Sequence, residues 1–110
     1  MTTAIIINHN GMGHGDDVLG LQILQTALNK AAVFRQLEAI VFYNSGVKLL
    51  FEGSECLPVL AALHDLGVEL IACGTCVNHF ASPEKVCIGT VGTMDDIVAV
   101  LARAEKVITL

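Results

Sequence analysis

The sequence is short of charged residues, and its few basic residues are scattered rather than clustered. It has 6 lysines and arginines against 11 aspartates and glutamates, a formal net charge of −5 at pH 7. A chain without a basic patch has nothing to hold a polyphosphate backbone, so direct nucleic-acid binding is disfavoured. Charged residues make up 15% of the chain and hydrophobic residues 54%. This balance indicates a large buried share, as in a sheet covered on both faces.

Long apolar runs are also missing, as are repeats and low-complexity tracts. No run approaches the roughly 20 residues needed to span a bilayer, so no membrane association is expected. Residues 1–8 lack the basic start and cleavage-site pattern of a signal peptide. We therefore expect a cytoplasmic protein. In that reducing setting its 4 cysteines are expected to be thiols, catalytic groups or metal ligands rather than structural disulfides.

The 110 residues fit one domain, 1–110, in which strands and helices alternate. The predicted strands cover residues 4–8, 39–43, 68–72, 86–89 and 107–110. The predicted helices cover residues 17–34, 54–67, a short stretch after 76, and 94–104, with Thr93 as the cap of the last. This alternation predicts an α/β fold, a mostly parallel five-stranded sheet in a three-layer α/β/α arrangement with right-handed crossovers.

Open parallel sheets place their sites beyond the carboxyl ends of the strands. Here those ends carry residues 8–16, 44–46 and 73–76, three polar or glycine-rich loops that are expected to meet on one rim. The candidate substrate-binding residues on this rim are Asn8, His9, Gly11, Gly13, Asn44, Ser45, Gly74, Thr75 and His79.

The strongest chemical signal is the Cys-Gly-Thr-Cys at 73–76, where an apolar strand turns into a helix. Free N–H groups and the helix dipole at such a turn favour a thiolate, so Cys76 in the first helical turn is expected to be the more acidic thiol. Gly74 permits a tight turn, and the Thr75 hydroxyl can cap the helix. His79 lies one turn beyond Cys76 and can hold or pass a proton.

The remaining cysteines and histidines have simpler explanations. Cys56 and Cys87 are expected to be small buried hydrophobes that react slowly. His14 and His64 are expected to be ordinary surface or cap histidines.

The glycine cluster at residues 11–15 invites comparison with phosphate-binding loops. It has neither the Gly-x-Gly-x-x-Gly spacing nor the Lys-Ser/Thr ending of a P-loop, and Asp16 and Asp17 would repel an anion. Nucleotide binding is therefore disfavoured, and no cofactor is expected. The glycines are expected instead to let the backbone approach the cysteine loop.

Two other uses of the cysteines stay open. A zinc site could use up to four ligands, Cys73, Cys76, His79 and Cys87. However, zinc sites of this kind usually have two Cys-x-x-Cys pairs and this chain has one, and its hydrophobic core is large enough to fold without a metal. The second alternative is thiol–disulfide exchange of the thioredoxin kind. It is disfavoured because the motif follows what looks like the third strand and lacks a preceding tryptophan.

Several segments together resemble the DsrE/DsrF-like sulfur-relay family. They are Asn-Ser-Gly-Val-Lys-Leu at 44–49, Glu-Gly-Ser-Glu at 52–55, Gly-Val-Glu-Leu-Ile-Ala-Cys-Gly-Thr-Cys at 67–76 and Ala-Glu-Lys-Val-Ile at 104–108. More narrowly, with the Gly-Met-Gly-His-Gly-Asp-Asp at 11–17, the chain is similar to the C-terminal domain of YedF-type proteins. These are described as sulfurtransferase-like and linked to selenium metabolism.

The resemblance implies a DsrE-like fold of flavodoxin-like architecture, and assembly into dimers, trimers or hexamers. It also implies that a cysteine just after the third strand carries a persulfide, and the matching position is Cys73. Cys76 belongs to the narrower subgroup and would stabilise or release the carried atom. We expect a homo-oligomer, dimer or trimer, that exchanges sulfur with donor or acceptor proteins such as a TusA-like partner. A non-catalytic module that binds a small ligand or partner is the competing interpretation.

Overall fold

Five strands form one sheet in the order β4-β3-β2-β1-β5, and every neighbouring pair is parallel. The computed structural model describes residues 2–110. The strands are β1 (Thr3–Ile7), β2 (Leu37–Phe42), β3 (Glu69–Cys73), β4 (Thr90–Gly92) and β5 (Lys106–Thr109). The sheet is thus wholly parallel where the sequence predicted a mostly parallel one.

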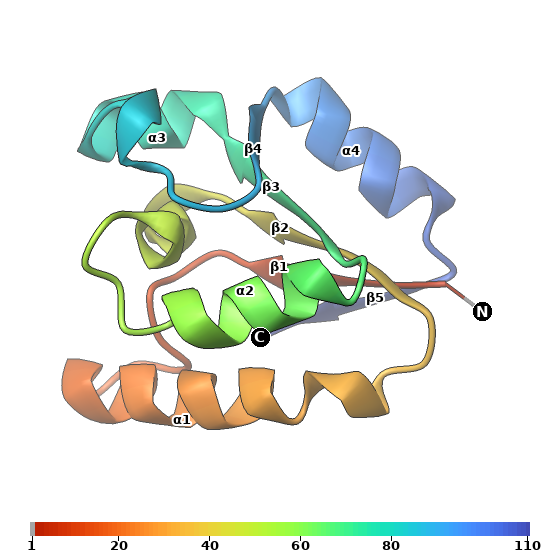
Figure 1. Ribbon diagram of the computed structural model, residues 1–110, viewed down its shortest axis with the longest axis horizontal. Coiled ribbons are helices and arrows are strands. Elements are labelled where there is room, and N and C mark those ends of the chain that lie inside the picture. The colour runs from red at the N-terminus through yellow and green to blue at the C-terminus, as the bar shows by residue number, and fades with distance from the viewer. Residues whose placement is uncertain (1) are drawn as a thin grey trace.

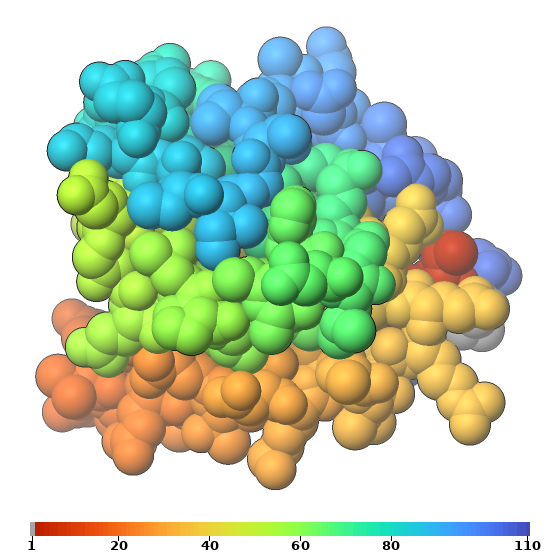
Figure 2. All heavy atoms as spheres, in the orientation of Figure 1, coloured from red at the N-terminus to blue at the C-terminus, as the bar shows by residue number. Residues whose placement is uncertain are grey.

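The order of the strands decides which face each helix covers. The helices are α1 (Asp17–Asn29), α2 (Leu57–Asp65), α3 (Gly74–Phe80) and α4 (Met94–Arg103). The chain steps from β1 to β4 in one direction, and α4 then carries it back across the sheet to β5. Right-handed crossovers therefore put α1 and α2 on one face and α4 on the other, as Figure 1 shows. Figure 2 shows α1 and α2 packed side by side along the lower part of the molecule. The predicted three-layer α/β/α fold is confirmed.

The two faces of the sheet bury side chains of different size. Successive residues of a strand point to opposite faces. The side under α1 and α2 buries large residues of β1, β2 and β3, namely Ile5, Ile7, Ile40, Phe42 and Leu70. The side under α4 buries a smaller cluster, Ala4, Ala39, Val41, Ile71, Cys73, Ile97 and Val100. The main core therefore lies between the sheet and the first two helices.

Several predicted boundaries shift by a turn. The first helix ends at Asn29, and a separate 3₁₀ turn follows at Ala31–Val33, because the Lys30 N–H bonds back to the Ala27 and Leu28 carbonyls and tightens the end. The stretch after β2, expected to be only a connection, forms a 3₁₀ helix over Asn44–Leu50.

The fourth strand was predicted at 86–89, and this is wrong. The strand is Thr90–Gly92, while Val86 makes an isolated antiparallel bridge with Phe51 and the Cys87 N–H donates to the Leu50 carbonyl at 2.9 Å. Val86 and Ile88 pack against the main hydrophobic cluster instead of entering the sheet. Gly89, with φ of +84°, turns the chain toward β4.

Two helix boundaries follow the expected chemistry. A capping box joins Thr93 and Asp96 at the start of α4, and α3 ends at Phe80 before Ser82 and Pro83. No helix within residues 2–110 has the length and apolar character to cross a membrane.

Candidate functional site

The loops that follow β1, β2 and β3 are joined to one another by hydrogen bonds. The Ser45 Oγ accepts the Asn10 N–H at 3.2 Å and lies 3.1 Å from the His9 Nδ1. The Asn44 N–H donates to the Cys76 Sγ at 3.1 Å. These bonds link the first loop to the second and the second to the third, so the predicted convergence at the carboxyl ends of the strands is confirmed.

A glycine allows the second loop to lie directly on the first strand. A Cβ at Gly46 would be 2.2 Å from the Ile7 carbonyl oxygen, a distance that no side chain tolerates. Asn44 has φ of +51°, a left-handed conformation that asparagine adopts more readily than most residues. Together these two residues turn the chain so that the Asn44 N–H faces the cysteine loop.

The two cysteines of the motif have different surroundings. Cys73 is only 3% exposed, and its side chain belongs to the cluster under α4. Cys76 is half-buried and touches the hydrophobic clusters on both faces of the sheet. The neighbouring Cys73 interacts with the Cys76 thiol, and the two thiols are free. The pair therefore combines an accessible sulfur with a hidden one.

Burial raises the pKa of the Cys76 thiol. The Asn44 N–H acts in the opposite direction, because it stabilises the thiolate, and the neighbouring Cys73 raises the pKa further. The expectation that the first helical turn makes Cys76 acidic is therefore wrong: desolvation outweighs the favourable N–H groups. Thr75 does not cap α3 either, since the N-cap residue is Cys73 and no side chain caps it.

A pocket of about 250 Å³ opens beside Cys76. It is lined by Asn44, Thr75, Cys76, His79 and Phe80. Four of these were predicted site residues, and the structure brings them together.

Phe80 and Lys48 were missed by the sequence analysis. The Lys48 Nζ lies 4.5 Å from the centre of the Phe80 ring. The His79 and Phe80 rings are nearly perpendicular, with their centres 4.9 Å apart. Phe80 lies one turn beyond Cys76, so helical spacing could have indicated it, whereas nothing in the spacing indicated Lys48.

Other predicted residues lie elsewhere on the rim. His9, Gly11 and Gly13 line a separate pocket of about 260 Å³ that Asp17 also borders. Asn8 is half-buried just after β1. A Cβ on Gly74 would come within 3.0 Å of the Gly92 carbonyl, so this glycine fits the close packing of α3 against β4.

The glycine-rich loop approaches α1 and not the cysteine loop. A Cβ at Gly11 would be 3.1 Å from the backbone of Gly20, and the Met12 N–H donates to the Gly20 carbonyl at 2.9 Å. The expected approach of this loop to the cysteines is therefore wrong; the hydrogen bond to Cys76 comes from the second loop, through the Asn44 N–H.

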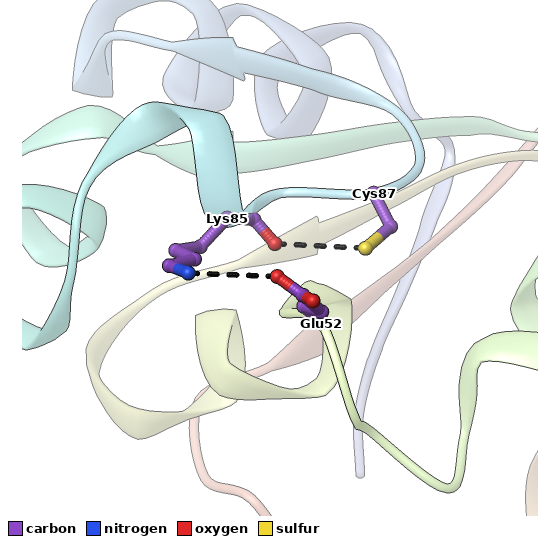
Figure 3. A network of polar contacts seen from close by, with 3 residues as sticks. All are labelled: Glu52, Lys85 and Cys87. Carbon is purple, nitrogen blue, oxygen red and sulfur yellow. Dashed lines mark hydrogen bonds and ion pairs between the residues drawn. The ribbon is translucent and has the colours of Figure 1, made fainter.

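Cys87 is exposed, which corrects the expectation that strand packing buries it. Figure 3 shows its sulfur directed at the Lys85 carbonyl, 3.6 Å away, while the Lys85 ammonium group reaches the Glu52 carboxylate at 3.5 Å. Cys56 is fully buried as predicted. Within residues 2–110 no three cysteine, histidine or acidic side chains are grouped to hold a metal ion, so the four candidate zinc ligands do not form one set.

The family model described as DsrE/DsrF-like matches residues 1–110. Among solved structures, the YchN protein from E. coli superposes with a TM-score of 0.74 at 19% identity, covering 99% of this chain and 98% of that one.

A second solved structure is MTH1491 from Methanobacterium thermoautotrophicum, a protein of unknown function. It gives a TM-score of 0.72 at 18% identity with 99% and 98% coverage. At these identities the two structures support the fold alone. No curated protein matches the sequence at a significant level. Because the family model spans the whole sequence, this chain belongs to the DsrE/DsrF-like family.

Proposed function

We propose that the chain is a small cytoplasmic sulfur relay, which accepts sulfane sulfur as a persulfide at the Cys73 and Cys76 pair and passes it on. Family membership is consistent with a sulfur-relay role. The observation that carries the proposal is the Cys76 sulfur, which borders an open pocket and accepts the Asn44 N–H. A backbone donor aimed at sulfur stabilises a thiolate and, after transfer, a persulfide anion.

The chemistry needs a soft nucleophile and a partner thiol. The Cys76 thiolate attacks the outer sulfur of a donor, and the electron pair of the broken sulfur–sulfur bond leaves with the donor. Cys73 supplies a neighbouring second thiol, which would stabilise the carried sulfur or attack the persulfide and close a disulfide. The family resemblance assigns the carried atom to Cys73, whereas exposure favours Cys76 as the first acceptor, because Cys73 is 3% exposed.

Intact mass measured after incubation with inorganic polysulfide tests the proposal. We expect the wild-type chain to gain sulfur, Cys76→Ser to lose the gain at the motif, and Cys73→Ser to keep it. If Cys73→Ser loses the gain and Cys76→Ser keeps it, Cys73 is the first acceptor, as the resemblance implies. If peptide mapping finds no added sulfur at either cysteine, the chain is a binding module instead.

We further propose that the chain acts as a homo-oligomer, a dimer or a trimer, with a TusA-like protein as donor or acceptor. Exposed apolar side chains on α4 and β5 support the first part: Met94, Val98 and Val107 are 46%, 53% and 43% exposed. Large apolar side chains left exposed on a monomer favour association. Light scattering at micromolar concentration tests the assembly, and a monomeric mass would contradict it.

Selenium is the second element that such a site can carry, as the similarity to YedF-type proteins implies. Selenium is softer and more polarisable than sulfur, and the same thiolate would accept it. Parallel loading with a selenium donor and with a sulfur donor, read by mass, distinguishes the two elements, because the heavier atom gives the larger gain.

A further inference from the structure

The side chains around the Cys76 pocket carry positive or neutral groups only. Asn44, Thr75 and Phe80 are neutral, His79 has a ring N–H, and the Lys48 ammonium group lies over the Phe80 ring. No aspartate or glutamate lines the pocket, although the chain has 11 of them and a net charge of −5. We propose, on the basis of the sulfur relay above, that this pocket takes a small sulfur-containing anion of the thiosulfate class as its sulfur donor.

The charge of Lys48 is available to such an anion. Lys48 borders a second hollow together with Glu55, yet within residues 2–110 no ion pair joins Lys48 to any carboxylate. The aromatic ring holds the ammonium group beside the pocket through a cation–π contact. His79 lies on the same helix, one turn from Cys76, and offers a hydrogen bond from its ring. An anion in the pocket would therefore lie beside the His79 ring and near the Lys48 ammonium group, and no carboxylate is among the residues described as lining the pocket.

The size of the pocket selects the donor. Its volume of about 250 Å³ is below the roughly 300–1,000 Å³ of pockets that enclose drug-sized ligands. A cofactor-sized donor would project into solvent, whereas an anion of a few heavy atoms fits with water to spare, at roughly 30 Å³ per water. The pocket is therefore matched to an inorganic anion.

The reaction balances without a further reagent. The Cys76 thiol first loses its proton to solvent, and the thiolate then attacks the outer sulfur of thiosulfate. A sulfur–sulfur bond forms to Cys76 as the bond inside thiosulfate breaks, and its electron pair leaves with sulfite. The products are a Cys76 persulfide anion and one sulfite dianion, so the total charge is unchanged. Lys48 and His79 would hold the oxygens of the departing group, where charge accumulates.

The test measures initial rates of persulfide formation from thiosulfate, with sulfite quantified in the same samples. We expect one sulfite per persulfide, with the added sulfur mapped to Cys76. Lys48→Gln and His79→Gln should each raise the KM for thiosulfate about fivefold, the effect of one partly exposed charge or donor. Lys106→Gln is the matched control. Lys106 is an exposed lysine paired with Thr3 at the opposite end of the sheet, and its loss should leave the KM unchanged.

Cys87 supplies an internal control in the same molecule. It is exposed, but the nearby Lys85 ammonium group is already paired with Glu52 (Figure 3). Polysulfide, which modifies accessible thiols without a binding site, should load both Cys76 and Cys87. Thiosulfate should load Cys76 alone.

The outcomes separate this inference from the relay itself. Loading of Cys76 by polysulfide but not by thiosulfate would overturn the inference and leave the relay standing. Loading by neither donor would overturn both. Loading by thiosulfate at equal KM in wild type, Lys48→Gln and His79→Gln would overturn the role of the two donors, and equal loading of Cys87 would overturn the pocket as the site.

Discussion

The loop after β3 and the segment before β4 each present a cysteine to solvent, but only the first has the features of a site. Cys76 lies on α3, accepts the Asn44 N–H, contacts a second thiol and borders a pocket. Cys87 lies in an irregular segment, and its sulfur has only the long contact to the Lys85 carbonyl. Exposure alone therefore does not give a thiol these surroundings. The meeting of three loops at the carboxyl ends of the strands provides what Cys87 lacks.

The largest effect is expected in the alkylation rates of the buried Cys56 and the exposed Cys87. Burial, and secondarily the charge of Glu55, raise the pKa of Cys56 from its ordinary value of 9.0 to about 11. At neutral pH this lowers the thiolate fraction about a hundredfold relative to a thiol of ordinary pKa, and burial slows attack further. Timed alkylation with peptide mapping should label Cys87 first and Cys56 last. Labelling of Cys56 ahead of Cys87 would contradict the burial.

The same pKa fixes the sign of a pH effect on stability. The folded state binds the Cys56 proton more tightly than the unfolded state does. Its contribution to the free energy of unfolding is therefore complete below about pH 9 and is lost as the pH rises through about 11. Denaturant unfolding of wild type and Cys56→Ala between these pH values should show a steeper decline for wild type. Parallel curves would rule out the thiol as the cause.

Two glycines make close backbone contacts in the loop after β2, which bonds to Cys76, and in the segment before β4, and replacing either should be costly. A Cβ would be 2.2 Å from the Ile7 carbonyl at Gly46, and 2.5 Å from the Leu70 carbonyl at Gly89. We expect Gly46→Ala and Gly89→Ala to lower the free energy of unfolding by roughly 3 kcal/mol each, the upper range of overpacking.

Gly53→Ala is the control for these two variants. Gly53 has positive φ as Gly89 does, but a Cβ there meets no atom within 4 Å, so only the backbone strain of about 1–2 kcal/mol remains. Equal costs at all three positions in denaturant unfolding would show that close contact is not the reason.

The bond to Cys76 comes from the backbone of Asn44 and not from its side chain. Asn44→Gly should therefore keep sulfur loading at Cys76 and fold at least as stably, since glycine adopts positive φ freely. Asn44→Ala should cost about 1 kcal/mol of unfolding free energy, because a Cβ disfavours this conformation. Loss of loading in Asn44→Gly would show that the amide side chain acts directly.

The smallest effect is expected at the ion pair near Cys87. Lys85 and Glu52 are 3.5 Å apart with side chains 53% and 73% exposed. Exposed pairs of this kind are worth at most about 1 kcal/mol. Lys85→Ala should change the free energy of unfolding by less than about 0.5 kcal/mol and leave sulfur loading at Cys76 unaltered. A larger change in urea unfolding would mean that the segment before β4 is more firmly anchored than its contacts indicate.

The alternation of apolar runs with helical spacing was enough to predict the layers, a mostly parallel sheet and the rim where the three loops meet. The misplaced fourth strand shows the limit of that pattern. Residues 86–88 have the composition of a strand, but only Gly89 packed against Leu70 determines where pairing with β3 begins. The same limit applies to Cys87. The pattern placed it in a strand and so predicted burial, but its segment lies outside the strand and leaves it exposed.

The sequence by itself determined the order of the elements and the Cys-Gly-Thr-Cys at the turn after β3, because local spacing controls both. The tertiary structure decided which of the two thiols is accessible, because the side chain of Cys73 points into the cluster under α4. It also decided the sign of the pKa shift at Cys76, since desolvation depends on neighbours from distant segments. The placement of Lys48 and Phe80 beside the pocket has the same origin: they are 32 residues apart in the chain, and only the packing of the loop after β2 against α3 makes them neighbours.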